Sequence, residues 1–222
     1  GGSVFTGRFG ASWTALVIEP VSSLEEFIPR SATDLYGAAG ATFGAYEMAG
    51  VRWRDETAPP IDLGTGRSFA FLAGGIFMLT ARDILVFQPP TREWRTFPYP
   101  SGMDLGAVGM SITDNSSVWT STDTALVRAS PASAEVVSYS TAGFTTARPR
   151  LTYDGPTGRI FFAQPGTASL HSLDMLSREI RLESTAPGNV GMVFCSDRGG
   201  HLYIGSSDAR QVWQYTPASS RW

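Results

Sequence analysis

The chain of 222 residues has no lysine, a single cysteine, Cys195, and only two histidines, His171 and His201. One cysteine cannot form an internal disulfide, so the sequence has neither a disulfide framework nor a cysteine-based metal site. No apolar run approaches the roughly 20 residues that a membrane-spanning helix needs. All 17 basic residues are arginine, and with 20 acidic residues they give a net charge of -3. This negative net charge argues against a nucleic acid as partner, because binding a nucleic-acid backbone needs a basic stripe.

Charged residues make up only 17% of the chain, whereas hydrophobic residues make up 42%. A chain of this length and composition buries a substantial core, which excludes a disordered chain and a disulfide-stapled mini-protein. The 24 glycines and 14 prolines are spread along the sequence, as in a fold of many short elements joined by turns. The first residues, Gly1-Gly2-Ser3, show no signal peptide. We expect one domain over residues 1–222.

An aliphatic-aromatic pair of residues recurs along the chain at spacings of 41, 42, 42 and 42 residues. A short apolar run precedes each pair, another follows it, and turn residues separate them, so each unit is interpreted as four short strands. Four strands in about 42 residues are typical of a β-propeller blade. We therefore predict an all-β, five-bladed β-propeller in which the pairs are buried between blades. The pairs are Leu35-Tyr36, Ile76-Phe77, Val118-Trp119, Ile160-Phe161 and Leu202-Tyr203.

The two ends of the sequence predict how the ring closes. Trp13 has the phase of an outer fourth strand, whereas the last unit stops at Trp222, where its own fourth strand should begin. We therefore expect Trp13–Ile18 to pair with the strand near Val212–Tyr215, which would close the ring and remove exposed strand edges. In an alternative interpretation, Val4-Phe5-Thr6 is a third strand followed by its turn. The chain is then six-bladed or a slice of a longer propeller.

Two units share a detailed pattern of an apolar strand, a Gly-Gly pair and an aliphatic-aromatic strand. They are Val193 to Tyr203, with Gly199-Gly200, and Phe69 to Phe77, with Gly74-Gly75. This pattern resembles tachylectin-type five-bladed lectins and the propeller repeats of bacterial sensor and surface proteins. The resemblance covers most of the chain and implies the propeller fold. The Gly-Gly-Trp and Asp-Asn-Trp elements that mark the lectin family are missing, so no sugar-binding residue is carried over.

Few residues are suited to catalysis. His171 and His201 lie in different elements, which disfavours a metal site or a catalytic triad. Cys195 lies on an inner strand and is interpreted as a small buried apolar residue. A glycosidase on this fold would need two or three carboxylates at the central channel, and Glu25-Glu26 and Asp104 are the only candidates. Solvated loop acids are the favoured interpretation, so we predict no catalytic residue, no metal and no cofactor.

The turns between the second and third strands should all emerge on one face, because the repeat gives every unit the same topology. These turns carry short polar and charged side chains, and the fourth-to-first-strand loops, such as 98–105 and 141–150, should border them. Aspartate and serine often cap such turns through local backbone hydrogen bonds, which is the favoured interpretation. In the functional interpretation they bind a ligand, because loops on a repetitive scaffold carry its function. The predicted ligand-binding residues are Arg82, Asp83, Asp123, Gln164, Asp208 and Arg210.

Taken together, these patterns favour a non-catalytic binding module that recognises a carbohydrate or a protein surface through the loops of one propeller face. A structural or adhesive component of a surface or virion assembly is an alternative, and a glycosidase or lyase is a less favoured one. The expected partner is therefore a glycan or a protein surface, or a larger assembly that contains the chain. The expected location is extracellular or surface-exposed.

Overall fold

The computed structural model describes residues 4–6, 14–16, 26–29, 34–39, 42–47, 52–60, 69–99, 104–106, 108–109, 111–130, 135–197 and 199–222. Every regular element among them is a β-strand, and no helix is present in these ranges. Predictions that concern Trp13, Glu25 and the side chain of Glu26 lie outside the described residues.

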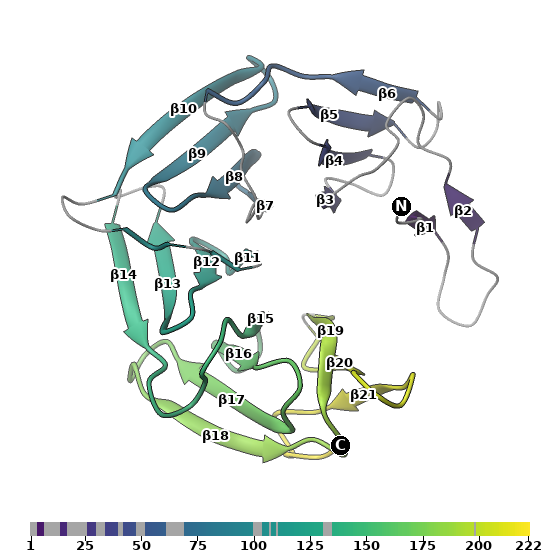
Figure 1. The fold of residues 1–222 in the computed structure, drawn as a ribbon, viewed down its shortest axis with the longest axis vertical. Helices are drawn as coiled ribbons and strands as arrows, with labels where there is room; N and C mark the ends of the chain where they lie inside the picture. The colour runs from purple at the N-terminus through teal and green to yellow at the C-terminus, as the bar shows by residue number, and fades with distance from the viewer. Residues whose placement is uncertain are drawn as a thin grey trace.

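The strands form five blades around one axis and a separate two-stranded sheet (Figure 1). Blade 1 contains β3 (Glu26–Pro29), β4 (Asp34–Ala39), β5 (Thr42–Glu47) and β6 (Arg52–Asp55). Blade 2 contains β7 (Phe69–Leu72), β8 (Gly75–Leu79), β9 (Asp83–Gln88) and β10 (Glu93–Pro98). Blade 3 contains β11 (Ile112–Thr113), β12 (Val118–Ser121), β13 (Ala125–Ser130) and β14 (Glu135–Ser140). Blade 4 contains β15 (Arg150–Asp154), β16 (Arg159–Ala163), β17 (Ser169–Asp174) and β18 (Ile180–Thr185). Blade 5 contains β19 (Val190–Ser196), β20 (Leu202–Ser206) and β21 (Val212–Tyr215).

Each blade is an antiparallel meander in which strands adjacent in sequence are adjacent in the sheet. The inner strands β3, β7, β11, β15 and β19 contact one another in this order and surround the axis (Figure 1). This arrangement confirms the predicted five-bladed β-propeller.

The recurring aliphatic-aromatic pairs all lie on second strands, and those of blades 2, 3 and 4 fill the spaces between blades. Alternate residues of a strand point to opposite faces of the sheet, so the two members of a pair reach two different interfaces. In blade 2, Ile76 packs with residues of blade 1, whereas Phe77 packs with residues of blade 3. In blade 4, Ile160 packs with blade 3 and Phe161 with blade 5. The recurring aliphatic-aromatic pair that predicts the blades is therefore a packing motif.

The predicted closure of the ring by an N-terminal strand is wrong in its pairing. The strand β2 (Thr14–Leu16) pairs with β1 (Val4–Thr6) and not with β21. The register, Val4 with Leu16 and Thr6 with Thr14, is that of a local antiparallel pair. Closing a pair over a short stretch of chain costs less entropy than pairing both ends of the sequence. The pairing agrees with the alternative interpretation, in which Val4-Phe5-Thr6 is a third strand followed by its turn.

The C-terminal residues begin the fourth strand of blade 5. Thr216 and Arg221 form an antiparallel bridge. It corresponds to the pairing of Gln88 with Glu93, which is the first residue pair between the third and fourth strands of blade 2. Trp222 then packs against Tyr215, with ring centroids 4.8 Å apart. Its indole N–H donates to Ser184 Oγ of blade 4 at 2.7 Å. Trp222 therefore joins blades 4 and 5.

Candidate binding face

The turns between second and third strands and the loops from a fourth strand to the next blade lie at the same end of the blades, which we call the loop face. Among the described residues it comprises the turns 80–82, 122–124, 164–168 and 207–211. It also comprises the loop residues 56–60, 99, 104–106, 108–109, 111, 141–149 and 186–189. The first-to-second-strand turns define the opposite end, the turn face.

Hydroxyl groups cap three of the turns on the loop face. Thr80 Oγ1 accepts the backbone N–H of Asp83 at 2.9 Å, and Thr122 Oγ1 accepts that of Ala125 at 3.0 Å. Ser206 Oγ accepts the N–H of Ala209 at 2.9 Å. The capping residues recur with the blade period, as Thr80, Thr122 and Ser206. The interpretation that aspartates cap these turns is therefore wrong. Hydroxyl side chains cap them instead. The carboxylates of Asp83, Asp123 and Asp208 do not accept from the backbone of these turns.

The six predicted site residues all lie on or beside the loop face, spread over blades 2 to 5. Asp123, with a side chain 64% exposed, pairs with Arg148 Nε at 3.3 Å. Gln164 Oε1 accepts the backbone N–H of Thr146 at 2.7 Å. In both cases the partner comes from the loop 141–149. Within the part of the chain that the structure describes, no hydrogen bond or ion pair joins two of the six residues, so they do not form a single cluster.

In blade 2, Arg82 Nε donates to Asp104 Oδ2 at 3.2 Å across the loop face. The backbone N–H of Gly106 and the Arg82 guanidinium lower the pKa of Asp104, so its carboxylate stays ionised. Asp83 is half-buried at the start of β9. Burial raises the pKa of the nearby Tyr99, and the negative charge of Asp83 raises it further. Asp104, a candidate acid from the sequence, is thus a partner of Arg82.

In blade 5, Asp208 accepts a hydrogen bond from Ser206 Oγ at 2.8 Å. Arg210 is exposed and has a φ of 48°, a left-handed conformation that few residues other than glycine adopt. The partners Thr146, Arg148 and Asp104 are absent from the predicted set. Their loops are predicted to border the site, but these loops vary in length, so the periodicity does not show which residue meets which turn.

Three aspartates cap turns on the turn face. Asp114 Oδ1 accepts the N–H of Ser117 at 2.7 Å, and Asp154 Oδ2 accepts that of Thr157 at 3.2 Å. Asp197 Oδ1 accepts that of Gly199 at 2.7 Å. Each is the last residue of a first strand or follows it directly, so a single carboxylate fixes this turn in blades 3, 4 and 5. These three aspartates therefore have a structural role, whereas Asp123 and Asp208 on the loop face are exposed.

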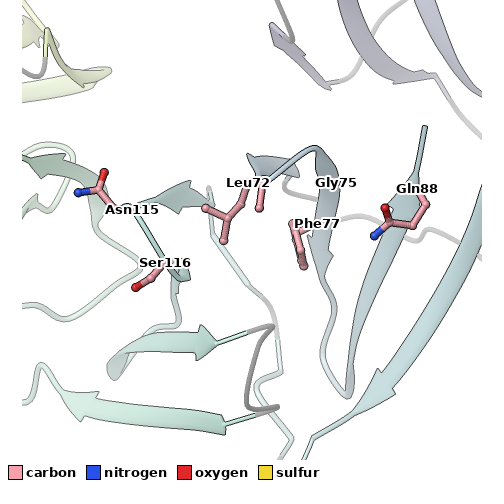
Figure 2. A pocket seen from close by; sticks show the side chains of 7 residues that line it. Leu72, Gly75, Phe77, Gln88, Asn115 and Ser116 are labelled. Atoms are coloured by element: carbon pink, nitrogen blue, oxygen red, sulfur yellow. The ribbon is translucent and has the colours of Figure 1, made fainter. Parts of the chain in front are cut away.

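Two of the hollows that are lined by described residues contain no predicted site residue. One, of about 300 Å³, lies on the turn face between blades 2 and 3, where Leu72 and Phe77 lie between the amides of Gln88 and Asn115 (Figure 2). The other, of about 220 Å³, lies among the inner strands β11, β15 and β19.

Cys195 corrects one expectation. It is exposed on β19 rather than buried, and partial burial together with the charge of Asp197 raises the pKa of its thiol. A raised pKa lowers the thiolate fraction, so Cys195 is a weak nucleophile. His201 Nδ1 lies 2.9 Å from Asp197 Oδ2, on the exposed side of the same blade.

His171 is buried between blades 3 and 4. Its ring stacks on Phe162 at 5.3 Å and meets the edge of Phe144 at 5.5 Å. Burial lowers the pKa of His171 below 6.5, because the charged form is poorly solvated there. No group of three or more metal-ligating side chains occurs among the described residues. In the same residues, no helix is long and apolar enough to cross a membrane.

Acidification is expected to reduce the free energy of unfolding through His171. As the pH falls through about 6.5, the unfolded chain takes up a proton that the folded imidazole does not yet accept, which favours unfolding. His171→Phe should therefore flatten the pH dependence between about 7 and 5. Urea unfolding at a series of pH values measures this dependence. An unchanged slope in His171→Phe would contradict the assignment.

The arrangement of its blades defines the chain as a β-propeller. Comparison of the sequence with protein-family models and with curated proteins gives no match. Among solved structures, the extracellular domain of BT4673, a proposed one component system from B. thetaiotaomicron, is similar to this chain with a TM-score of 0.70 and 14% identity. The match covers 99% of this chain and 31% of that chain, so this chain spans about a third of that structure. At this identity the likeness shows the fold alone.

Proposed function

We propose that the protein is a non-catalytic binding module that recognises a carbohydrate or a protein surface through its loop face. The observation that carries the proposal is the pairing of exposed charged groups across fixed turns, as in Asp123 with Arg148 and Arg82 with Asp104. Carboxylates and guanidinium groups held in this way can exchange hydrogen bonds with hydroxyls or with a polar protein surface.

The backbone of the loop face is held by the loops as well as by the hydroxyl caps. The N–H of Leu105 donates to Ala81 O at 2.8 Å, and that of Thr141 donates to Thr124 O at 2.8 Å. The N–H of Ser207 donates to Asn189 O at 2.9 Å. Such bonds fix the polar side chains before a ligand arrives, which reduces the entropy lost on binding.

Two further observations bear on the alternatives. A general acid needs a raised pKa, and the lowered pKa of Asp104 disfavours that role in a glycosidase. The exposed Met192, Val193 and Val212 on blade 5 favour the second candidate, a component of a larger assembly. An extracellular location is part of the proposal, supported by the extracellular domain that shares the fold.

Asp123→Ala and Asp208→Ala are expected to weaken binding to an identified ligand about ten- to a hundredfold each, because each removes a charged hydrogen-bonding group. A glycan array screened with the purified protein identifies a carbohydrate ligand, and titration calorimetry then compares the variants. Glu179→Ala is the matched control, since Glu179 is exposed on a third-to-fourth-strand turn. If both aspartate variants bind as tightly as the wild type, the site is not on this face.

A further inference from the structure

The hollow of about 300 Å³ on the turn face lies beside a position of blade 2 that carries no side chain. This position is Gly75, which lies on the face of β8 that turns toward blade 3, because Phe77, two residues further on, packs there. The residues one, two and three periods of 42 after Gly75 are Ser117, Arg159 and His201. Their side chains have polar partners at 2.9, 3.3 and 2.9 Å. The glycine therefore leaves open a position that carries a bonded side chain in blades 3, 4 and 5.

The backbone conformation does not explain the glycine at this position. Gly74 has a φ of 83°, but Gly75 is not among the residues with a positive φ. A Cβ built on Gly75 would lie 3.3 Å from Phe77 Cε2 and 3.4 Å from Gln88 Nε2, and both of these residues line the hollow. The missing side chain thus provides room for a group that packs above the Phe77 ring and beside the Gln88 amide.

Two primary amides flank this room. In Figure 2, Gln88 of blade 2 and Asn115 of blade 3 lie on either side of Leu72 and Phe77. Neither amide has a hydrogen-bond partner among the described residues. Each amide carries both N–H donors and an acceptor oxygen. The described residues that line the hollow are all uncharged, so they suit a neutral ligand that has donors and acceptors at its edges.

The apolar floor of the hollow favours a peptide over a sugar. Beside the two amides, the only other polar side chain among the described lining is Ser116, whose Oγ is already bonded to Asp114. A sugar would bury hydroxyls without partners here, which is costly. Phe77 is only 5% exposed, so its ring has no open face on which a sugar can stack. An extended peptide instead has its N–H and C=O groups along its edges and an apolar side chain on one face.

We propose that this hollow binds an uncharged, extended segment of a partner polypeptide. An apolar side chain of the segment packs above Gly75 and Phe77, and its main-chain amides lie between Gln88 and Asn115. The two side-chain amides exchange hydrogen bonds with water for hydrogen bonds with the peptide, and burial of the apolar side chain supplies the net free energy. The hollow is on the turn face, so this site is separate from the loop face of the proposed function.

The capped peptide Ac-Gly-Leu-Gly-NH2 is the probe for this site, titrated into ¹⁵N-labelled protein and followed by NMR. We expect it to shift the side-chain NH2 signals of Gln88 and Asn115 and to saturate at roughly 1–10 mM, as suits a ligand of this size. Ac-Gly-Asp-Gly-NH2 should leave both signals in place, because the hollow has no partner for a buried charge. If the leucine peptide moves neither signal, or if methyl α-glucoside saturates them and the leucine peptide does not, the proposal is wrong.

Variants of the hollow separate specific from general binding. Gly75→Ala should weaken binding of the leucine peptide at least about tenfold, because its methyl group occupies the room above Phe77. Asn115→Asp should weaken it about tenfold through the lost donor, and since Asn115 is exposed the fold should be kept, as checked by thermal unfolding. Gly199→Ala is the matched control, because its Cβ would also have its nearest neighbour at 3.3 Å, in the corresponding turn of blade 5.

Gly199→Ala should bind the leucine peptide like the wild type, and so should Asp123→Ala of the loop face. If Gly75→Ala and Asn115→Asp both bind it as tightly as Gly199→Ala, the peptide does not occupy the hollow and the proposal fails. If Asp123→Ala weakens binding as much as Gly75→Ala, the peptide site extends to the loop face, which also contradicts the proposal.

Discussion

Asp114→Ala is expected to lower the free energy of unfolding by about 3 kcal/mol, which corresponds to a fall of roughly 6–12 °C in the melting temperature. Asp114 is 4% exposed, and its Oδ1 accepts the N–H groups of Ser116 at 2.6 Å and Ser117 at 2.7 Å. Its Oδ2 accepts the indole N–H of Trp119 at 2.7 Å. Trp119 is 1% exposed, so the variant leaves a buried donor without its partner.

A double-mutant cycle with Trp119→Phe separates the indole bond from the turn cap. The phenylalanine keeps a ring in the interface between blades 3 and 4 but cannot donate, so we expect a coupling of about 1–2 kcal/mol between the two positions. Asp123→Ala is the matched control on the loop face. Its carboxylate is 64% exposed, and its loss should change the free energy of unfolding by less than about 0.5 kcal/mol. If Asp123→Ala costs as much as Asp114→Ala, aspartates on both faces are structural.

The contrast between these aspartates shows where the sequence pattern succeeds and where it fails. Periodicity of about 42 residues predicts the blades, because the second strand of every blade must bury both of its faces. The same periodicity does not distinguish an aspartate that caps a turn from one that faces solvent. Asp123 follows the capping Thr122, whereas Asp114 precedes the turn that it caps. That difference depends on which residue directly follows or ends the strand, which the spacing of the aliphatic-aromatic pairs does not specify.

Ring closure depends on a different kind of information. The phase of the N-terminal segment predicts a fourth strand, and β2 is indeed the later strand of a pair. Which strand it joins is decided by chain connectivity, because β1 lies close to β2 in sequence and β21 does not. The pairs between loops and turns, such as Thr146 with Gln164, are likewise long-range contacts that the repeat period does not encode.

Glu56→Ala is expected to cost about 2–3 kcal/mol of unfolding free energy, because it breaks the ionic link between blades 1 and 2. The Glu56 side chain is only 2% exposed, and its Oε2 lies 2.6 Å from Arg92 Nε. Its Oε1 lies 2.9 Å from Arg54 NH2. Arg92 also donates to Asp55 O at 2.8 Å. Its φ of 57° is left-handed, so the ion pair with Glu56 holds a residue of strained backbone conformation in place. The arginines are about half exposed and can be hydrated, which keeps the cost below that of a fully buried pair.

The surface pair Arg52 with Glu47 is the control for this bridge. Its atoms lie 3.8 Å apart and the Arg52 side chain is 67% exposed, so Arg52→Ala should cost less than about 0.5 kcal/mol. Glu56→Gln keeps the shape and an acceptor oxygen but loses the charge. Its loss of unfolding free energy should therefore lie between those of Glu56→Ala and Arg52→Ala. Urea unfolding measures all three variants in the same buffer. If Glu56→Ala and Arg52→Ala are equally mild, blades 1 and 2 are held by the contacts of Phe43 with Phe87 and Trp94, and the buried carboxylate adds nothing to their association.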